Sequence, residues 1–187
     1  AVSGAATLPN RVVEEVAGRF GVRILEGYGL TEAAPGVTRA TDDDTPIGSI
    51  GRPMAGMEVR IVDAAGEDVY IGDEGEILVR GDNVFVGYLD DPEATARAMD
   101  PQGWLHTGDI AVVDDDGFVY IVDRAKDLII VSGFNVFPAE VERVLNAHPG
   151  VVESGVVGVP HPHTGESVKA FIVCLLYTSP SPRDGIG

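Results

Sequence analysis

The chain has 187 residues, of which 44% are hydrophobic, so it can bury a core and does not have the composition of a disordered protein. Its formal net charge of −17 repels nucleic acid and anionic membrane surfaces, and no apolar run approaches the ~20 residues of a membrane span. The 24 glycines and 12 prolines favour short strands and many turns over a helical bundle. The single cysteine, Cys174, excludes an intrachain disulfide, fits a reducing cytoplasm and is expected as a small buried residue in a strand.

The first predicted element is an amphipathic helix over residues 9–20, followed by Gly21, which suits the left-handed conformation that ends a helix. Its apolar residues share one helical face: Val12, Val13, Val16 and Phe20. A short strand at 22–25 and a loop at 26–32, EGYGLTE, come next. Two glycines around a tyrosine are typical of backbone near a ligand, but this loop has no lysine for a phosphate.

The middle of the chain, from about residue 50 to 125, has a hydrophobic period of two, which predicts an antiparallel sheet or a small barrel. Asp115-Asp116-Gly117 is a hairpin signal, and Asp91 is the expected N-cap of a short helix that starts at Pro92. Three consecutive aspartates at 42–44 lie in a predicted exposed loop, because they lack the alternating spacing of a calcium loop.

After residue 126 the pattern becomes strand, helix (138–147), strand and strand, which predicts a separate small α+β unit. We therefore place a domain boundary near 124–127. The last residues, 174–187, do not continue the pattern, and we expect a read-through or cloning scar there, with a native disordered tail as the alternative. The chain starts without Met and in mid-pattern, so we expect it to be a piece of a longer protein.

Two further groups of residues are candidates for chemistry. Thr107-Gly108-Asp109 places a carboxylate after a glycine, and an ionised carboxylate can accept hydrogen bonds from the paired hydroxyls of a ribose. Taken alone, the motif favours a turn aspartate over a ribose ligand. Arg124 and Lys126 form a rare cationic spot at the predicted boundary, where ligand clefts tend to lie. Surface ion pairs with Asp123 and Asp127 are the alternative reading of these cations.

The histidines are weaker candidates. His106 precedes Thr-Gly-Asp and could act as a base, but a histidine on the surface of a strand is favoured. His161-Pro162-His163 could suggest a metal, but two histidines without a third ligand are more often part of a loop.

Five segments together carry a family resemblance: GYGLTE, GEILVRGDNVFVGY, GWLHTGD, DRAKDLIIVSGFNVFPAEVE and VVGVPHPHTGESVKAFIV. Their order and spacing resemble the acyl-adenylate-forming (AMP-binding) superfamily, and among its members the chain is similar to bacterial long-chain fatty-acyl-CoA ligases. The match covers about residues 1–173. It implies an α/β and α+β protein: residues 1–125 would be the C-terminal part of the large adenylating domain (a short α/β piece plus an antiparallel β-barrel), and 126–173 the start of the small α+β domain.

The resemblance implies a nucleotide site near the N-terminus. Gly4 and Ala5 would lie near the adenine, and Tyr28 would stack on its ring beside Gly29, which lets the ligand approach.

It also implies contacts to the phosphate, the metal and the ribose. Thr31 would bond the α-phosphate, and Glu32 would hold Mg²⁺ as a hard oxygen ligand. Asp109 would take the ribose hydroxyls, assisted by Arg124.

The small domain is implied to move. Lys126 falls at the hinge about which this domain rotates between two half-reactions, and Gly133 would lie beside the tunnel for the pantetheine of CoA. The implied substrates and cofactors are ATP, Mg²⁺, a fatty acid and CoA, giving acyl-AMP and then acyl-CoA.

The departures from the family pattern concern lysines. The glycine-rich phosphate loop with its lysine would lie upstream, and the catalytic lysine would follow residue 173; neither Lys126 nor Lys169 is at that position. We therefore expect that this chain alone does not form acyl-AMP at a useful rate. Two alternatives remain: another adenylating enzyme (aryl- or aminoacyl-activating, or a carrier-protein ligase), and a non-catalytic nucleotide-binding module.

Overall fold

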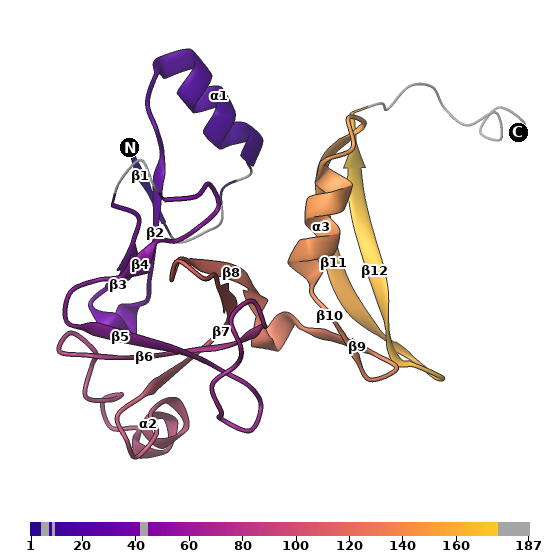
Figure 1. Cartoon of the computed structure of the whole chain (residues 1–187). Coiled ribbons are helices and arrows are strands. Elements are labelled where there is room, and N and C mark those ends of the chain that lie inside the picture. Colours follow the sequence, from indigo (N-terminus) through magenta and orange to yellow (C-terminus); the bar gives the residue numbers. More distant parts are fainter. Residues whose placement is uncertain (5–7, 9, 42–44, 176–187) are drawn as a thin grey trace, which may run out of the picture. The chain divides into compact units, whose positions relative to one another are not determined.

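The computed structural model describes residues 1–4, 8, 10–41 and 45–175 (Figure 1). Ala5, the aspartates at 42–44 and the predicted tail from 176 onward lie outside the described residues. The chain divides into two compact units, Ala1–Ala125 and Lys126–Gly187, and each is described by itself. Within the described part of the chain, no helix has the length and apolar character that crossing a membrane requires.

A β-α-β element opens the first unit. Strand β1 (Val2–Ser3) runs parallel to β2 (Leu25–Gly29), and helix α1 (Asn10–Phe20) connects them, as parallel neighbours require a crossover. Helix α1 ends as predicted at Gly21, which has φ 64° and donates its N–H to the carbonyl of Ala17. Val13 is buried, whereas Phe20 from the same predicted face is exposed.

Strand β2 corrects the prediction of a loop over EGYGLTE. The strand occupies Leu25–Gly29 instead of 22–25, and only Thr31–Ala33 (η1) forms a 3₁₀ turn. Its two neighbours explain the difference, because β1 on one side and antiparallel β3 (Gly36–Arg39) on the other pair with the glycine-containing backbone. A short strand β4 (Arg52–Pro53) completes this sheet in the order β1-β2-β3-β4.

The second sheet of this unit is antiparallel, in the order β5-β6-β7-β8. Its strands are β5 (Met57–Val62), β6 (Gly75–Gly81), β7 (Leu105–Val113) and β8 (Val119–Arg124). Strands β5 and β8 form its edges, so these four strands make an open sheet. The predicted hairpin turn joins β7 to β8 with Gly117 at φ 78°.

Helix α2 (Pro92–Ala98) lies between β6 and β7 in the chain and begins as the sequence predicts. The Asp91 carboxylate accepts the N–H of Ala94 at 2.8 Å, and Pro92 occupies the first turn, where its missing N–H is not needed.

The two sheets of the first unit share one hydrophobic core. Apolar side chains alternate along β5 to β8 toward Ala33 of η1 and Val37 of β3, because successive strand residues face opposite sides. The buried members of this core are Ala33, Val37, Ile50, Met57, Ile61, Ile77, Val79, Leu105, Ala111 and Val119. A backbone bridge between Gly51 and Val119 also ties the segment before β4 to β8.

The second unit starts with a 3₁₀ turn, η2 (Ala125–Asp127), that overlaps its boundary. Its antiparallel sheet has the order β10-β9-β12-β11, and helix α3 (Pro138–Asn146) packs against β11. The strands are β9 (Ile129–Val131), β10 (Phe134–Val136), β11 (Val151–His161) and β12 (Gly165–Cys174). Cys174 ends β12 but is exposed, so its expected burial was wrong.

Candidate functional site

Tyr28 and Asp109 form the central contact of the candidate site. Tyr28 lies near the end of β2 and Asp109 in β7, 81 residues later, yet the phenol donates a hydrogen bond of 2.7 Å to Oδ2 of the carboxylate. Burial raises the pKa of Tyr28, and the bond and charge of Asp109 add to the rise. The phenol therefore stays protonated at neutral pH and acts as a donor.

Arg124 lies on the other side of the same carboxylate. Asp109 and Arg124 are register partners in β7 and β8, and Nε of the guanidinium lies 3.4 Å from Oδ1. The Asp109 side chain is 17% exposed and that of Arg124 59%. An ionised carboxylate has about four lone-pair positions, so Asp109 keeps acceptor capacity beyond these two contacts.

The residues before Asp109 fix the direction in which it faces. Gly108 has φ 70°, a left-handed conformation that a glycine adopts without strain. The Thr107 hydroxyl donates to the carbonyl of Ile77 at 2.8 Å and accepts the N–H of Asp109 at 3.1 Å. Thr107-Gly108-Asp109 is therefore an irregular part of strand β7 and not a turn.

Glu32 belongs to a second cluster in the same unit. Its Oε1 accepts a 2.8 Å hydrogen bond from the Tyr88 phenol, which raises the pKa of Tyr88, and its carbonyl accepts the N–H of Phe85 at 2.7 Å. The Asn83 amide donates to the carbonyls of Ala33 and Gly36, at 2.6 and 2.9 Å. The segment after β6 thus holds η1 from one side.

Asn83 and Tyr88 contact η1 and its neighbouring residues, and reasoning from the sequence missed both residues. Both lie within the segment GEILVRGDNVFVGY, which carried part of the family resemblance but received no role. Thr31 itself is exposed at the start of η1, where its side chain is open to solvent.

Two glycines of the predicted site differ in what they permit. A Cβ at Gly29 would lie 1.8 Å from the carbonyl oxygen of Pro35, so no side chain fits there. That carbonyl accepts the N–H of Leu30 at 2.9 Å and closes the tight turn through η1. At Gly4 the nearest atom to a Cβ would be the carbonyl oxygen of Gly27 at 3.3 Å, a tight contact within the first sheet.

Lys126 and Gly133 lie in the second unit. Lys126 is exposed in η2. Gly133 has φ 85° in the turn between β9 and β10, and no heavy atom lies within 4 Å of where its Cβ would be. The turn therefore needs glycine for its backbone angle and leaves open space beside it.

Glu32 fits the part expected of a magnesium ligand. Mg²⁺ in nucleotide sites takes one or two carboxylates and completes its shell with phosphate and water. A single half-buried carboxylate at η1 matches that donor set. Among the described residues, three or more His, Cys, Asp or Glu side chains do not gather into a metal-binding group. The rings of His161 and His163 lie 5.9 Å apart, and Nδ1 of His161 lies 2.8 Å from the Thr164 hydroxyl.

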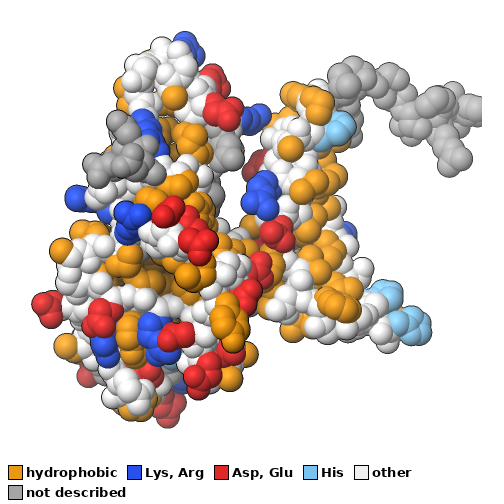
Figure 2. Space-filling model, viewed as in Figure 1, with side chains coloured by type: hydrophobic (Ala, Val, Ile, Leu, Met, Phe, Trp, Pro, Cys, Tyr) orange, Lys and Arg blue, Asp and Glu red, His pale blue; other side chains and the backbone are white. Residues whose placement is uncertain are grey.

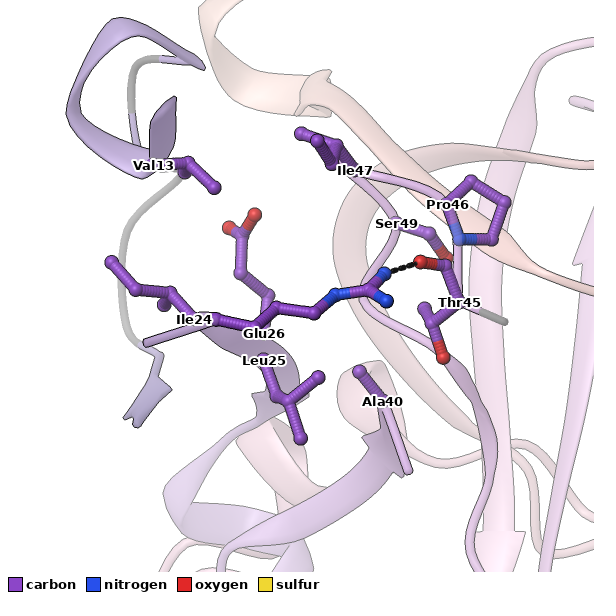
Figure 3. Close-up of a pocket in the computed structure, with 11 residues that line it drawn as sticks. Val13, Ile24, Leu25, Glu26, Ala40, Thr45, Pro46, Ile47 and Ser49 are labelled. Atoms are coloured by element: carbon purple, nitrogen blue, oxygen red, sulfur yellow. Dashed lines mark hydrogen bonds between the residues drawn. The ribbon is translucent and has the colours of Figure 1, made fainter. Parts of the chain in front are cut away.

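Figure 3 shows a pocket in the first unit, between α1, β2 and the segment 45–49. The carboxylate of Glu26 points into it beside Val13, and the Arg23 guanidinium donates to the carbonyl of Thr45. Neither Tyr28 nor Asp109 lines this pocket, so it is a different feature from the contact described above.

The comparisons with known proteins identify the family. The family of AMP-binding enzymes matches residues 1–89, and the C-terminal domain of AMP-binding enzymes matches residues 140–182, past the end of the motif resemblance. The chain thus belongs to the AMP-binding enzyme family, and the predicted fold class is confirmed.

Three similar proteins illustrate the relationship. A 3-[(3aS,4S,7aS)-7a-methyl-1,5-dioxo-octahydro-1H-inden-4-yl]propanoyl:CoA ligase of Rhodococcus jostii is 49% identical over 92% of this chain and 32% of its own length. A long-chain-fatty-acid–CoA ligase of Salmonella typhimurium is 48% identical over 91% and 30%. The crystal structure of ATP-bound MatB from Rhodopseudomonas palustris matches with a TM-score of 0.89 at 40% identity, covering 96% of this chain and 36% of that one. The chain spans about a third of these relatives.

Proposed function

We propose that the chain supplies the nucleotide site of an AMP-forming acid–thiol ligase, which activates a carboxylic acid with ATP and transfers the acyl group to CoA. The contact of Tyr28 with Asp109, beside Arg124, carries this proposal. It places an aromatic ring next to a carboxylate with spare acceptor capacity. A nucleotide uses both, because the base needs a ring face and the ribose hydroxyls need an acceptor.

The proposed acid is a fatty acid, and the proposed thiol is CoA. The Salmonella relative is named a ligase of long-chain fatty acids and CoA, and the Rhodococcus relative is named a CoA ligase of a ring-bearing propanoate. Both names combine a carboxylic acid with CoA, which supports this reaction class. We place the protein in the cytoplasm, where ATP and CoA are supplied.

Five residues have proposed roles at the nucleotide. Tyr28 stacks on the adenine, since a hydrogen bond from its hydroxyl lies at the ring edge and leaves the ring faces available. Asp109 accepts the ribose hydroxyls and Arg124 assists it. Thr31 bonds the α-phosphate, which its exposure permits, and Glu32 holds Mg²⁺.

Four further roles complete the proposal. Gly4 and Ala5 lie near the base, and Gly29 keeps the backbone beside Tyr28 free of a side chain. In the small domain, which we place at 126–173 after a large-domain part at 1–125, Lys126 is the hinge and Gly133 leaves space for pantetheine.

The reaction has two steps. The acid's carboxylate oxygen bonds to the α-phosphorus of ATP and pyrophosphate leaves, giving acyl-AMP. The CoA thiol, losing its proton, then bonds to the acyl carbon and AMP leaves. Mg²⁺, when bound, offsets phosphate charge; the chain's own residues hold the base, ribose and α-phosphate in position, which is the larger part of catalysis in such transfers.

A test uses a longer protein that contains this chain with its flanking coding sequence, assayed for acid-dependent pyrophosphate release. We expect Tyr28→Ala and Glu32→Ala each to lower kcat/KM for ATP roughly ten-fold or more, because each removes a contact to the nucleotide or its metal. The matched controls Tyr70→Ala and Glu93→Ala remove an exposed ring and an exposed carboxylate and should leave kcat/KM unchanged.

Unchanged kinetics in both site variants would remove this loop from the nucleotide site. The 187-residue chain by itself should catalyse no ATP–pyrophosphate exchange above a blank without protein. Exchange well above the blank would show that the two lysine-bearing segments are not needed for adenylation.

A further inference from the structure

We propose that Glu76 is a positioning residue for Asp109: its carboxylate holds the backbone of Gly108 so that Asp109 faces Tyr28 and the ribose of a bound nucleotide. The inference rests on the proposed function, because the ribose contact of Asp109 belongs to that proposal. Glu76 lies on β6, 33 positions before Asp109, and its own side chain does not reach the nucleotide contact.

The strand register shows why a positioning residue is needed. Glu76 pairs with Ile110 and Leu78 with His106, so the three residues 107–109 of β7 lie opposite Ile77 alone. Such an irregularity interrupts the regular ladder and re-aims the side chains within it. Asp109 is one of the re-aimed residues.

Side chains take the place of the interrupted ladder. The carbonyl of Ile77 accepts the Thr107 hydroxyl at 2.8 Å, and the N–H of Gly108 donates to Oε1 of Glu76 at 3.0 Å. A hydrogen bond from backbone N–H to an ionised carboxylate is among the stronger kinds. Glu76 and Thr107 thus bond the irregular segment from both strands.

The second oxygen of Glu76 fixes its orientation. Oε2 lies 3.0 Å from Nδ1 of His106, so the carboxylate bridges His106 and Gly108 on either side of Thr107. Its side chain is 27% exposed and that of His106 38%. This gives His106 a place in the structure without making it a base.

Removing Glu76 would release the segment toward a regular register. A slip of one residue sends every side chain of a strand to the opposite face. Asp109 would then turn away from Tyr28 and from the ribose. The loss of affinity would therefore affect nucleotides that carry the ribose hydroxyls and spare nucleotides that lack them. A general loss of affinity would affect both kinds equally.

The experiment compares four forms of the full chain: wild type, Glu76→Ala, Glu76→Gln and Glu58→Ala. Glu58 is the matched control, because it is a carboxylate on the same face of the same sheet that pairs with Arg80, away from β7. Binding of AMP and of 2′,3′-dideoxy-AMP is measured by calorimetry, and amide exchange at Gly108 by NMR in the absence of nucleotide.

Wild type and Glu58→Ala should prefer AMP over the dideoxy nucleotide roughly ten-fold, the loss expected from hydrogen bonds to a charged group. Glu76→Ala should bind both equally and show faster exchange at Gly108. Glu76→Gln should stay near wild type, because its amide oxygen still accepts the Gly108 N–H.

The outcomes separate the two proposals. A wild-type chain that binds both nucleotides equally would overturn the ribose role of Asp109, and the inference with it. If Glu76→Ala kept the full wild-type preference for AMP over the dideoxy nucleotide, the positioning role of Glu76 would be overturned, but the ribose role of Asp109 would not. Unchanged exchange at Gly108 in Glu76→Ala would overturn it regardless of nucleotide binding.

Discussion

The hydrogen bond from Tyr28 to Asp109 joins a phenol that resists ionisation to a carboxylate that is mostly buried. The protonated phenol is favoured more in the folded protein than in the unfolded chain, because burial disfavours ionised Tyr28, which would also lose its hydrogen bond to Asp109 and repel that carboxylate. The folded-state pKa of Tyr28 therefore lies above the ordinary value of about 10. Linkage turns that difference into a dependence of stability on pH.

The first prediction concerns Tyr28→Phe. Below about pH 10 the wild type should be more stable by ~1.5–3 kcal/mol, the contribution of a hydrogen bond to a charged group. As the pH rises above about 10, the unfolded chain releases the phenolic proton first, so this advantage shrinks toward the folded-state pKa. Urea unfolding of both proteins between about pH 8 and 11 measures this difference. If the free energy of unfolding changed with pH in the same way for wild type and Tyr28→Phe, the raised pKa assigned to Tyr28 would be contradicted.

At the scale of the element, η1 shows how tightly the site is built. Gly29 must lack a side chain because the carbonyl of Pro35 occupies its space, while the Asn83 amide donates to the carbonyls of Ala33 at the end of η1 and Gly36 at the start of β3. The turn is thus fixed by contacts from β2 and from the segment after β6.

A substitution in this turn is the second prediction. Gly29→Ala should destabilise the chain by about 1–3 kcal/mol or more, as overpacking against backbone does. Gly18→Ala is the matched control, because Gly18 lies in α1 with no atom within 4 Å of its Cβ position, so it should stabilise by ~0.5–1 kcal/mol. Thermal unfolding checks both, and equal effects would show that the contact with Pro35 does not constrain the turn.

Patterns of neighbouring residues in the sequence predicted those strands and helix ends that depend on neighbouring residues. The period of two gave the strands β5 to β8, and Asp91 with Pro92 gave the start of α2. Strand β2 was missed because its pairing with β1 and β3 depends on residues distant in the sequence. Glu76 was missed for the same reason: its bond to Gly108 exists only across the irregular register of two strands.

At the scale of the whole molecule, a large charge of one sign coexists with exposed apolar side chains. Figure 2 shows hydrophobic side chains on the visible surface of both units, among charged ones. Val86 is 98% exposed, Leu89 91% and Phe134 75%. The net charge of −17 keeps copies apart only where salt does not screen it.

The last prediction is therefore self-association that grows with salt. Raising NaCl from about 20 to about 500 mM shortens the screening length from about 20 Å to a few Å, so apolar contacts between copies are opposed less. Sedimentation velocity should show a larger mean mass at high salt, and Val86→Ser with Leu89→Ser should reduce it. A monodisperse monomer with a cooperative melt at both salt concentrations would contradict this.

The distance along the chain between Tyr28 and Asp109 has a consequence for folding kinetics. Their bond closes a loop of 81 residues, and the entropic cost of closure must be met before the contact can form. We therefore expect the candidate site to form late in folding, after the two sheets of the first unit have docked. A nucleotide that needs both residues would bind the docked state alone and would slow its opening.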